Sequence, residues 1–182
     1  MTNPVATAVS PSAQPGCWAA RPADCIAAFT VRNLGLRPVT GTIPVTVAEL
    51  TVGSGGHPAR LHAELDVRGL DTGSRRRDRD LRRPRFLGTG QWPVMTFTAD
   101  DIRPHGDGWT VHGTLAVKDT SCPVQLDVAA PRVALSAAAG PVQLRAAAQF
   151  DRRAAGVTAG PALLIGHLIT VTLTIRLQPP QA

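Results

Sequence analysis

Apolar and polar residues alternate along most of the second half of the chain. From Ile169 to Leu177 every second residue is apolar, and the residues between them are threonine or arginine. Successive side chains of a β-strand point to opposite faces, so this period of two predicts a strand with one buried and one exposed face. The same alternation predicts four more strands, over residues 61–67, 109–118, 124–128 and 142–150.

The first half of the chain also favours strands, although its pattern is less regular. Residues 26–32 and 43–52 have strand character, and the second segment changes phase between Val47 and Leu50, as a β-bulge would make it do. Pro44 places the start of this segment at an edge or a bend, because proline cannot donate a hydrogen bond to a neighbouring strand.

Helix signals are weak, because glycine and proline interrupt most windows of the sequence. Only residues 161–166 and the arginine-rich stretch around 75–90, which leads into a strand over 93–97, could hold a turn of helix. The chain is therefore predicted to be all-β and antiparallel, with about eight strands and a short helical or loop segment around 75–90.

Two arrangements suit about eight strands with one apolar face each, a closed barrel and a two-sheet sandwich. The alternation alone does not separate them. Gly113, Ala146 and Ala148 are small residues on otherwise apolar faces. They leave two interpretations open: a face that lines a cavity, or a solid core filled by side chains of different sizes.

The arginine-rich stretch is the most unusual part of the sequence. Between residues 75 and 85 two aspartates accompany seven arginines, namely Arg75, Arg76, Arg77, Arg79, Arg82, Arg83 and Arg85. Charged groups are costly to bury, so the stretch is predicted to lie on a surface, in a loop or at the mouth of a cavity. The net charge of +6 favours anionic partners, although an arginine-rich and alanine-rich composition also follows from a GC-rich genome.

The 182 residues are enough for one domain, which is predicted over 17–178. Residues 1–16 are rich in proline and small polar residues and are predicted to be a flexible tail. They have neither the basic start nor the apolar centre of a secretory signal, so a cytoplasmic location is expected. The three cysteines, Cys17, Cys25 and Cys122, lack metal-ligand spacing and are expected to be reduced thiols.

A series of short motifs runs in order from Trp18 to Leu177. The most specific are Thr72-Gly73, Arg77-Asp78, Leu81-Arg82, Phe86-Leu87, Pro93 and Thr96-Phe97. Further motifs are Phe29-Thr30-Val31-Arg32 with Gly41, Val111-His112-Gly113-Thr114-Leu115, Pro123-Val124-Gln125-Leu126 and Asp151-Arg152 with Gly156. Together they resemble the YceI family, the lipid-binding proteins of lipocalin-like fold often described as polyisoprenoid-binding.

The chain departs from that family at a few positions. Asp24-Cys25 stands where His-Ser is usual, and Asn33 stands where histidine is usual. The resemblance implies an extended, eight-stranded, antiparallel lipocalin-like β-barrel whose interior holds a long isoprenoid or fatty-acyl chain. It implies neither catalysis nor a cofactor.

Candidate binding residues follow from that role. The tunnel wall is expected from large residues on the apolar faces and near them, namely Trp92, Met95, Phe97, Trp109, Val111, Leu115, Phe150, Ile169, Val171 and Leu173. Ordinary core packing has the same sequence signature and stays an alternative for each. Arginine suits a phosphate or carboxylate head group, so a clamp is expected from Arg77, Arg79, Arg82 and Arg83. A solvated loop with local Asp78 and Asp80 pairs is the alternative.

Other functions are less favoured. The five histidines have no spacing that gathers metal ligands, although His62 and His112 could approach each other across strands. Nucleic-acid binding suits the charge, but the arginines are not interleaved with aromatic residues. A ligand-free, stress-associated scaffold is a third alternative. Peripheral contact with an anionic membrane and a homodimer both stay open.

Overall fold

A computed structural model gives the fold of most of the chain. It describes residues 15–32, 38–129, 131, 135–136, 140–159 and 166–181. The predictions made for Asn33 and for a helical turn over 161–165 lie outside the described residues, as does the tail up to residue 14. The first strand begins at Gly16, one residue before the predicted domain start.

The described residues form nine strands, against about eight predicted from the sequence, and two short helical segments. The strands are β1 (Gly16–Val31), β2 (Val39–Ile43), β3 (Val45–Val52), β4 (Pro58–Asp66), β5 (Val94–His105), β6 (Gly108–Val117), β7 (Thr120–Ala129), β8 (Val142–Asp151) and β9 (Leu168–Gln178). The helical segments are the 3₁₀-helix η1 (Val67–Gly69) and the α-helix α1 (Arg75–Leu81), both between β4 and β5.

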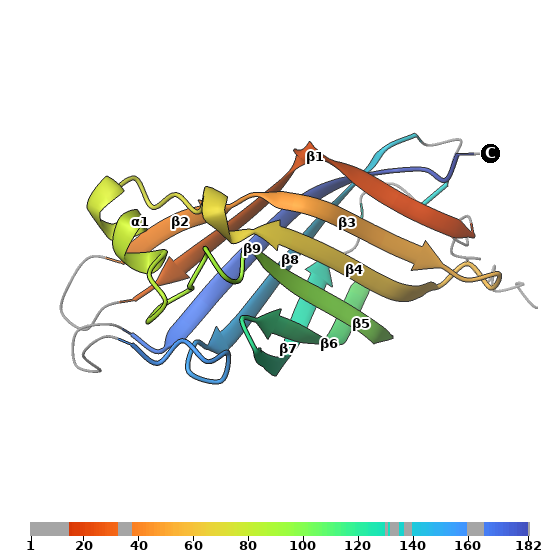
Figure 1. Cartoon of the computed structure of the whole chain (residues 1–182). Helices are drawn as coiled ribbons and strands as arrows, with labels where there is room; N and C mark the ends of the chain where they lie inside the picture. The colour runs from red at the N-terminus through yellow and green to blue at the C-terminus, as the bar shows by residue number, and fades with distance from the viewer. Residues whose placement is uncertain are drawn as a thin grey trace, which may run out of the picture.

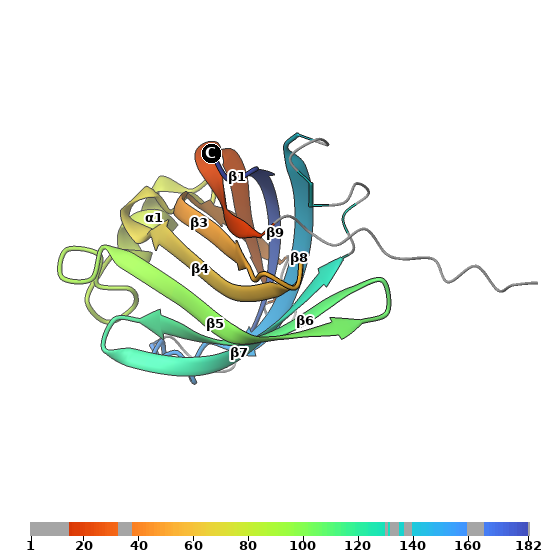
Figure 2. The same ribbon diagram turned by 90° about the vertical axis from the view of Figure 1, so that its right-hand side faces the viewer.

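The sheet closes into a barrel, which confirms that arrangement over a sandwich (Figures 1 and 2). Every pairing between neighbouring strands is antiparallel, and β1 also pairs with β9. The closed ring is therefore β1-β3-β4-β5-β6-β7-β8-β9, eight strands in all, and β2 adds to the second half of β1. Figure 1 shows α1 at one end of the elongated barrel, called the α1 end below, and the chain's C-terminus at the other.

The bulge predicted in β3 lies earlier than the sequence pattern indicates. Pairing with β4 shifts between Val45 and Val47, not between Val47 and Leu50. The extra residue is Thr46, which is exposed and donates its hydroxyl hydrogen to the Glu64 carbonyl at 3.2 Å. Apolar residues stand on both sides of Thr46, so the sequence alone does not show where the phase changes.

A cluster of apolar side chains packs at the end of the barrel where β1 begins and β9 ends, called the Trp18 end. Its buried members are Trp18, Leu50, Val52, Leu135, Val142, Leu144 and Leu177. Trp18 has no exposed surface, and Leu135 reaches the cluster from the connection between β7 and β8. This end is therefore filled by the protein's own side chains.

Gly113 on β6 leaves less room than its small size predicts. A Cβ atom built on Gly113 would lie 2.4 Å from Cζ of Phe97, on the neighbouring strand, and 2.6 Å from the Thr98 carbonyl oxygen. Phe97 itself is buried. The aromatic ring thus covers the glycine across the strand pair, so the inward side of this position is packed.

Replacing Gly113 with alanine is expected to destabilise the protein by about 1–3 kcal/mol, because the new methyl group would overpack the Phe97 contact. Urea denaturation measures the effect as a lower midpoint. Gly90→Ala is the matched control, since a Cβ there meets nothing within 4 Å. Equal midpoints for Gly113→Ala and the wild type would contradict the packing described for Phe97.

Candidate functional site

The inner face of the barrel gathers most of the residues predicted to line a tunnel. One apolar cluster joins eight of the ten, namely Met95, Phe97, Trp109, Val111, Leu115, Phe150, Val171 and Leu173. Ile169 pairs with Phe150 and with Val31 in the neighbouring strands. The sequence list omitted inward residues of the facing strands, such as Leu61, Val124 and Leu126, which belong to the same cluster. The alternation over residues 61–67 and 124–128 could have identified these inward residues.

The inner face is not buried uniformly. On β7 the inward residues Cys122, Val124 and Leu126 are buried. On β9 Val171 and Leu173 are only half-buried, as are Ala146 and Phe150 on β8. Side chains that point into a closed barrel retain accessible surface when protein atoms leave space beside them. The wall formed by β8 and β9 is one such part of the inner face, and Leu61, Met95 and Leu115 on β4, β5 and β6 are half-buried as well.

Trp92 lies apart from that face. It stands in the connection before β5, and its ring has the ammonium nitrogen of Lys118 5.3 Å from its centroid, a cation–π contact. A Cβ atom on Gly88 would lie 2.7 Å from the Trp92 ring, and Gly88 has a positive φ of 58°. Trp92 therefore packs in a loop. The apolar residues near it in the sequence resemble those of a strand, so the sequence pattern alone does not reveal this loop.

The arginine-rich stretch forms α1 and its flanking loops at the α1 end. Ser74 caps the helix by accepting a hydrogen bond from the Arg77 backbone N–H at 3.5 Å. Asp78 is only 6% exposed and accepts hydrogen bonds from the Thr72 backbone N–H at 3.0 Å and from the Thr72 hydroxyl at 2.6 Å. A buried aspartate thus ties the helix to the loop before it.

The four arginines proposed as a head-group clamp have different surroundings in the structure. Arg82 donates hydrogen bonds to the Arg68 carbonyl at 3.1 Å and to the Leu70 carbonyl at 2.7 Å. Arg83 lies 3.4 Å from the Asp80 carboxylate. Arg79 lines a surface hollow of about 700 Å³ together with Arg82, and Arg77 is half-buried in α1. Two of the four are therefore engaged by the protein itself.

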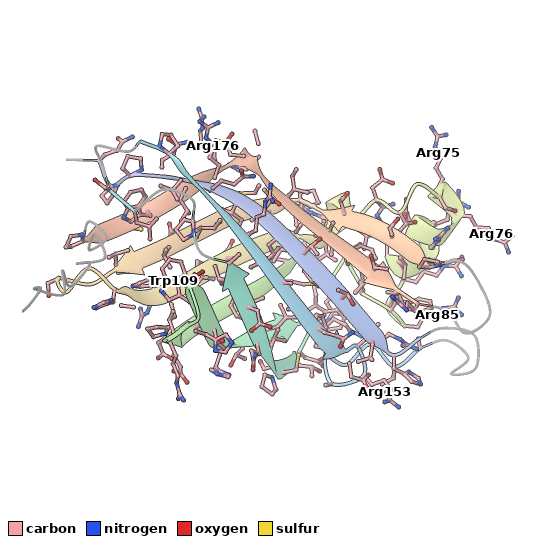
Figure 3. All side chains as sticks on the ribbon, turned by 180° about the vertical axis from the view of Figure 1, so that it is seen from behind. Arg75, Arg76, Arg85, Trp109, Arg153 and Arg176 are labelled. Atoms are coloured by element: carbon pink, nitrogen blue, oxygen red, sulfur yellow. The ribbon has the colours of Figure 1, made fainter. Side chains whose placement is uncertain are left out.

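Other arginines at this end face outward. Figure 3 labels Arg75, Arg76 and Arg85 at the α1 end, with their guanidinium groups directed away from the ribbon. Arg85 lies over the ring of Phe86, 5.1 Å from the centroid. The surface around α1 is therefore strongly basic, as the sequence predicts for a surface or a cavity mouth.

A charged residue that the sequence list omitted lies at the same end of the barrel. Arg152 follows β8 and is only 4% exposed. Its Nε donates to the Gly166 carbonyl at 3.1 Å, and its Nη1 donates to the carbonyls of Val157 at 2.5 Å and Ala159 at 3.0 Å. Burial lowers the pKa of Arg152, the nearby charge of Asp151 raises it by a smaller amount, and the charge of Arg153 lowers it further. Arg152 belongs to the Asp151-Arg152 motif of the sequence, but the motif does not indicate that the residue is buried.

Its two sequence neighbours pair with each other. Arg153 donates to the Asp151 carboxylate from Nε at 3.0 Å and also from Nη2, and its backbone N–H donates to Asp151 at 2.9 Å. These hydrogen bonds lower the pKa of Asp151 from 3.8 to about 2. They also raise the pKa of Arg153.

The outer face carries a second hollow, of about 1080 Å³, across β3 to β7. His62 and His112 line this hollow together, as expected if they approach each other across strands. Acidic residues such as Glu49 and Asp101 line it as well. His62 Nε2 lies 3.4 Å from the Glu64 carboxylate. Within the ranges that the structure describes, no group of three or more histidine, cysteine, aspartate or glutamate residues is arranged to hold a metal ion.

The three cysteines are free thiols in different surroundings. Cys17 is exposed, Cys25 is half-buried and Cys122 is buried. Burial raises the pKa of each thiol, so none has the lowered pKa typical of a reactive nucleophile. In the part of the chain that the structure describes, no helix is long and apolar enough to span a bilayer.

Comparison with known families agrees with the motif series. The family model for the YceI-like domain matches residues 18–177. A UPF0312 protein of Yersinia enterocolitica is 27% identical over 100 residues, which cover 54% of this chain and 52% of that protein. The chain thus spans about half the length of the curated relatives it matches.

Solved structures share the fold at lower sequence identity. Burkholderia cenocepacia BcnA superposes with a TM-score of 0.73 at 16% identity, over 86% of this chain and 98% of that one. A polyisoprenoid binding domain from Saccharophagus degradans, implicated in plant cell wall breakdown, gives a TM-score of 0.64 at 14% identity, over 92% of this chain and 100% of that one. At these identities the likeness establishes the barrel alone.

Asp78→Ala is expected to destabilise the protein by about 1–3 kcal/mol, because it leaves the Thr72 N–H and hydroxyl at a partly buried site without their acceptor. The midpoint of urea denaturation measures the loss. Asp80→Ala removes an aspartate from the same helix that meets only the exposed Arg83, and its effect is expected to stay below about 1 kcal/mol. Similar losses in both variants would contradict a special role for Asp78.

The Asp151 carboxyl is expected to titrate at a pKa of about 2, against an ordinary value of 3.8. Because the folded-state pKa is the lower one, its contribution to stability is complete above about pH 3.8 and disappears as the pH falls through 2. Carbon-detected NMR of the side-chain carboxyl measures this value. Arg153→Gln is expected to raise it toward 3.8, whereas Arg145→Gln on the same strand is the control. A wild-type value near 3.8 would refute the interaction.

Proposed function

The chain belongs to the YceI family, and we propose that its barrel binds a long-chain isoprenoid or fatty-acyl amphiphile in its apolar interior, without catalysis. One observation carries the proposal: inward apolar residues of β8 and β9 stay half-buried inside a closed ring of strands. A filled barrel would bury them as fully as it buries the inward residues of β7. The structural likeness to a polyisoprenoid binding domain supports the same ligand class.

The energetics of such a ligand fit an apolar wall. Each methylene group removed from water contributes about 0.8 kcal/mol, so a long chain gains affinity without specific polar contacts. The inner face supplies aromatic and branched side chains such as Trp109, Leu115 and Leu173 as its contacts. Selection by shape and length follows, because such a wall offers little else to recognise.

The two ends of the barrel differ in a way that supports one direction for the ligand. Trp18, Leu135 and their neighbours pack at one end and leave no charged group among the buried members of their cluster. The α1 end carries buried Arg152 and the arginine-rich surface. The apolar tail therefore points toward the Trp18 end and the polar head toward the α1 end.

The basic surface around α1 also suits peripheral contact with an anionic membrane, from which such a ligand would be taken. Arg75, Arg76 and Arg85 project from this end (Figure 3). A Lys or Arg near an anionic bilayer contributes about 1 kcal/mol, and the attraction weakens with added salt. This contact would bring the α1 end, and with it the head-group side of the barrel, to the lipid surface.

The purified protein is expected to release a prenyl or acyl species on extraction into organic solvent, at about one molecule per chain. Ala146→Trp is expected to weaken rebinding of that species at least about tenfold, because an indole on the inner face would displace two or more methylene groups at about 0.8 kcal/mol each. Mass spectrometry of extracts and of reloaded protein measures both effects. Ala146 lies between Val128 and Leu173 on the neighbouring strands.

Ala147→Trp is the matched control, since Ala147 is the next residue and is exposed on the outer face. It should bind like the wild type, and circular dichroism should show both variants folded. Equal binding by the two variants would place the ligand outside the barrel. A clean extract together with failed reloading of the wild type would refute lipid binding.

A further inference from the structure

Two polar residues continue the inward faces of β8 and β9 at the α1 end. Arg152 comes two residues after inward Phe150, and His167 comes two residues before inward Ile169. The Arg152 backbone N–H donates to the His167 carbonyl at 2.9 Å, so the strand pairing extends to these residues. Opposite residues of an antiparallel pair share a face. The apolar inner wall thus ends in an arginine and a histidine.

The guanidinium of Arg152 has unused hydrogen-bonding capacity. Nε and Nη1 donate to three backbone carbonyls, which fix the plane of the group. Nη2 makes no hydrogen bond to any residue that the structure describes, and it is not among the fully enclosed polar atoms that lack a partner. Two N–H groups of a residue that is only 4% exposed therefore have no acceptor among the residues that the structure describes.

No carboxylate neutralises Arg152 by direct contact. Across the described part of the chain, it forms no ion pair within 4.0 Å. Asp151 is near enough to act on Arg152 and on His167 through space, but its oxygens accept hydrogen bonds from Arg153. A buried charge without a paired counterion is costly, and this cost is removed when an anion binds.

His167 provides a second, independent sign of a missing partner. Its Nδ1 is buried and has no hydrogen-bond partner, and it is the one side-chain atom in that state among the described residues. Buried polar groups almost always have partners, so an orphan atom calls for an explanation. A ligand oxygen that accepts a hydrogen bond from the Nδ1–H group would provide one once the imidazole ring turns toward it.

We propose that Arg152 and His167 form the head-group subsite of the barrel, and that its ligand is an amphiphile with an anionic head, a carboxylate or a phosphate. This inference rests on the proposed function, because the subsite lies at the end of the same apolar wall. It replaces a clamp made by the surface arginines, since Arg82 and Arg83 are already engaged. The planar fork of Arg152 suits either head group, because both present paired oxygens.

The test compares three ligands that share one C15 prenyl chain: farnesol, farnesoic acid and farnesyl phosphate. Affinities of the delipidated full chain are measured by titration calorimetry. The wild type is expected to bind at least one of the two anions about tenfold more tightly than the alcohol, as a charge-assisted hydrogen bond would give. The order of the two anions identifies the head group as carboxylate or phosphate.

Variants then locate the preference. Arg152→Gln is expected to bind all three ligands alike, and His167→Gln to lose part of the preference. Arg145→Gln is the matched control, because it removes the same unit of charge from an exposed residue of β8. It should retain the full preference. If Arg152→Gln does not fold, because its three carbonyl contacts are weakened, the wild-type comparison and His167→Gln decide the question.

The outcomes separate the two proposals. Equal wild-type binding of farnesol and both anions would overturn the subsite and leave lipid binding intact. Equal loss of preference in Arg145→Gln and His167→Gln would also overturn it, because net charge would then explain the effect. Failure of the wild type to bind any of the three would overturn lipid binding and the subsite together.

Discussion

The pairing between β1 and β9 closes the barrel, and the enclosed inner face depends on it. β1 is 16 residues long and pairs with β9 through both of its halves, while β3 takes its beginning and β2 its end. The register shifts between Ala20 and Cys25, where Arg21 and Asp24 form an ion pair at 3.0 Å. This irregularity lets one strand serve two sets of neighbours. Without that closure, the apolar face would be the surface of an open sheet.

Closure encloses an apolar inner face and leaves the charged groups to the ends of the barrel. Along the middle of the strands the inward positions are apolar, because a polar group there would have no partner. At the Trp18 end, side chains from β1, β3, β8 and β9 fill the space. At the α1 end, by contrast, Asp78, Arg82 and Arg152 use their charges to hold loops through hydrogen bonds. The same charges make that end the polar one.

The sequence predicted most of the strands and most of the inner face, because the alternation of apolar and polar residues is a local pattern that corresponds directly to the two faces of a strand. It could not predict features that depend on contacts between distant residues. Phe97 covers Gly113 from the neighbouring strand. Arg82 donates hydrogen bonds to the carbonyls of Arg68 and Leu70, which lie 14 and 12 residues away in the sequence. Trp92 has strand-like neighbours but folds against Lys118. In each case the partner, which the pattern cannot name, decides the role of the residue.

Arg152 shows how burial changes the meaning of a charged residue. Seven arginines lie in the stretch from 75 to 85, and their number led to the prediction of a head-group clamp there. Exposed arginines are screened by water and salt, so their density says little about a specific site. One arginine that continues an inward face, held by three carbonyls and without a paired carboxylate, acts in a low-dielectric setting where a charge interacts far more strongly. If Arg152 holds the head group as proposed, that single position outweighs the whole basic surface in selecting it.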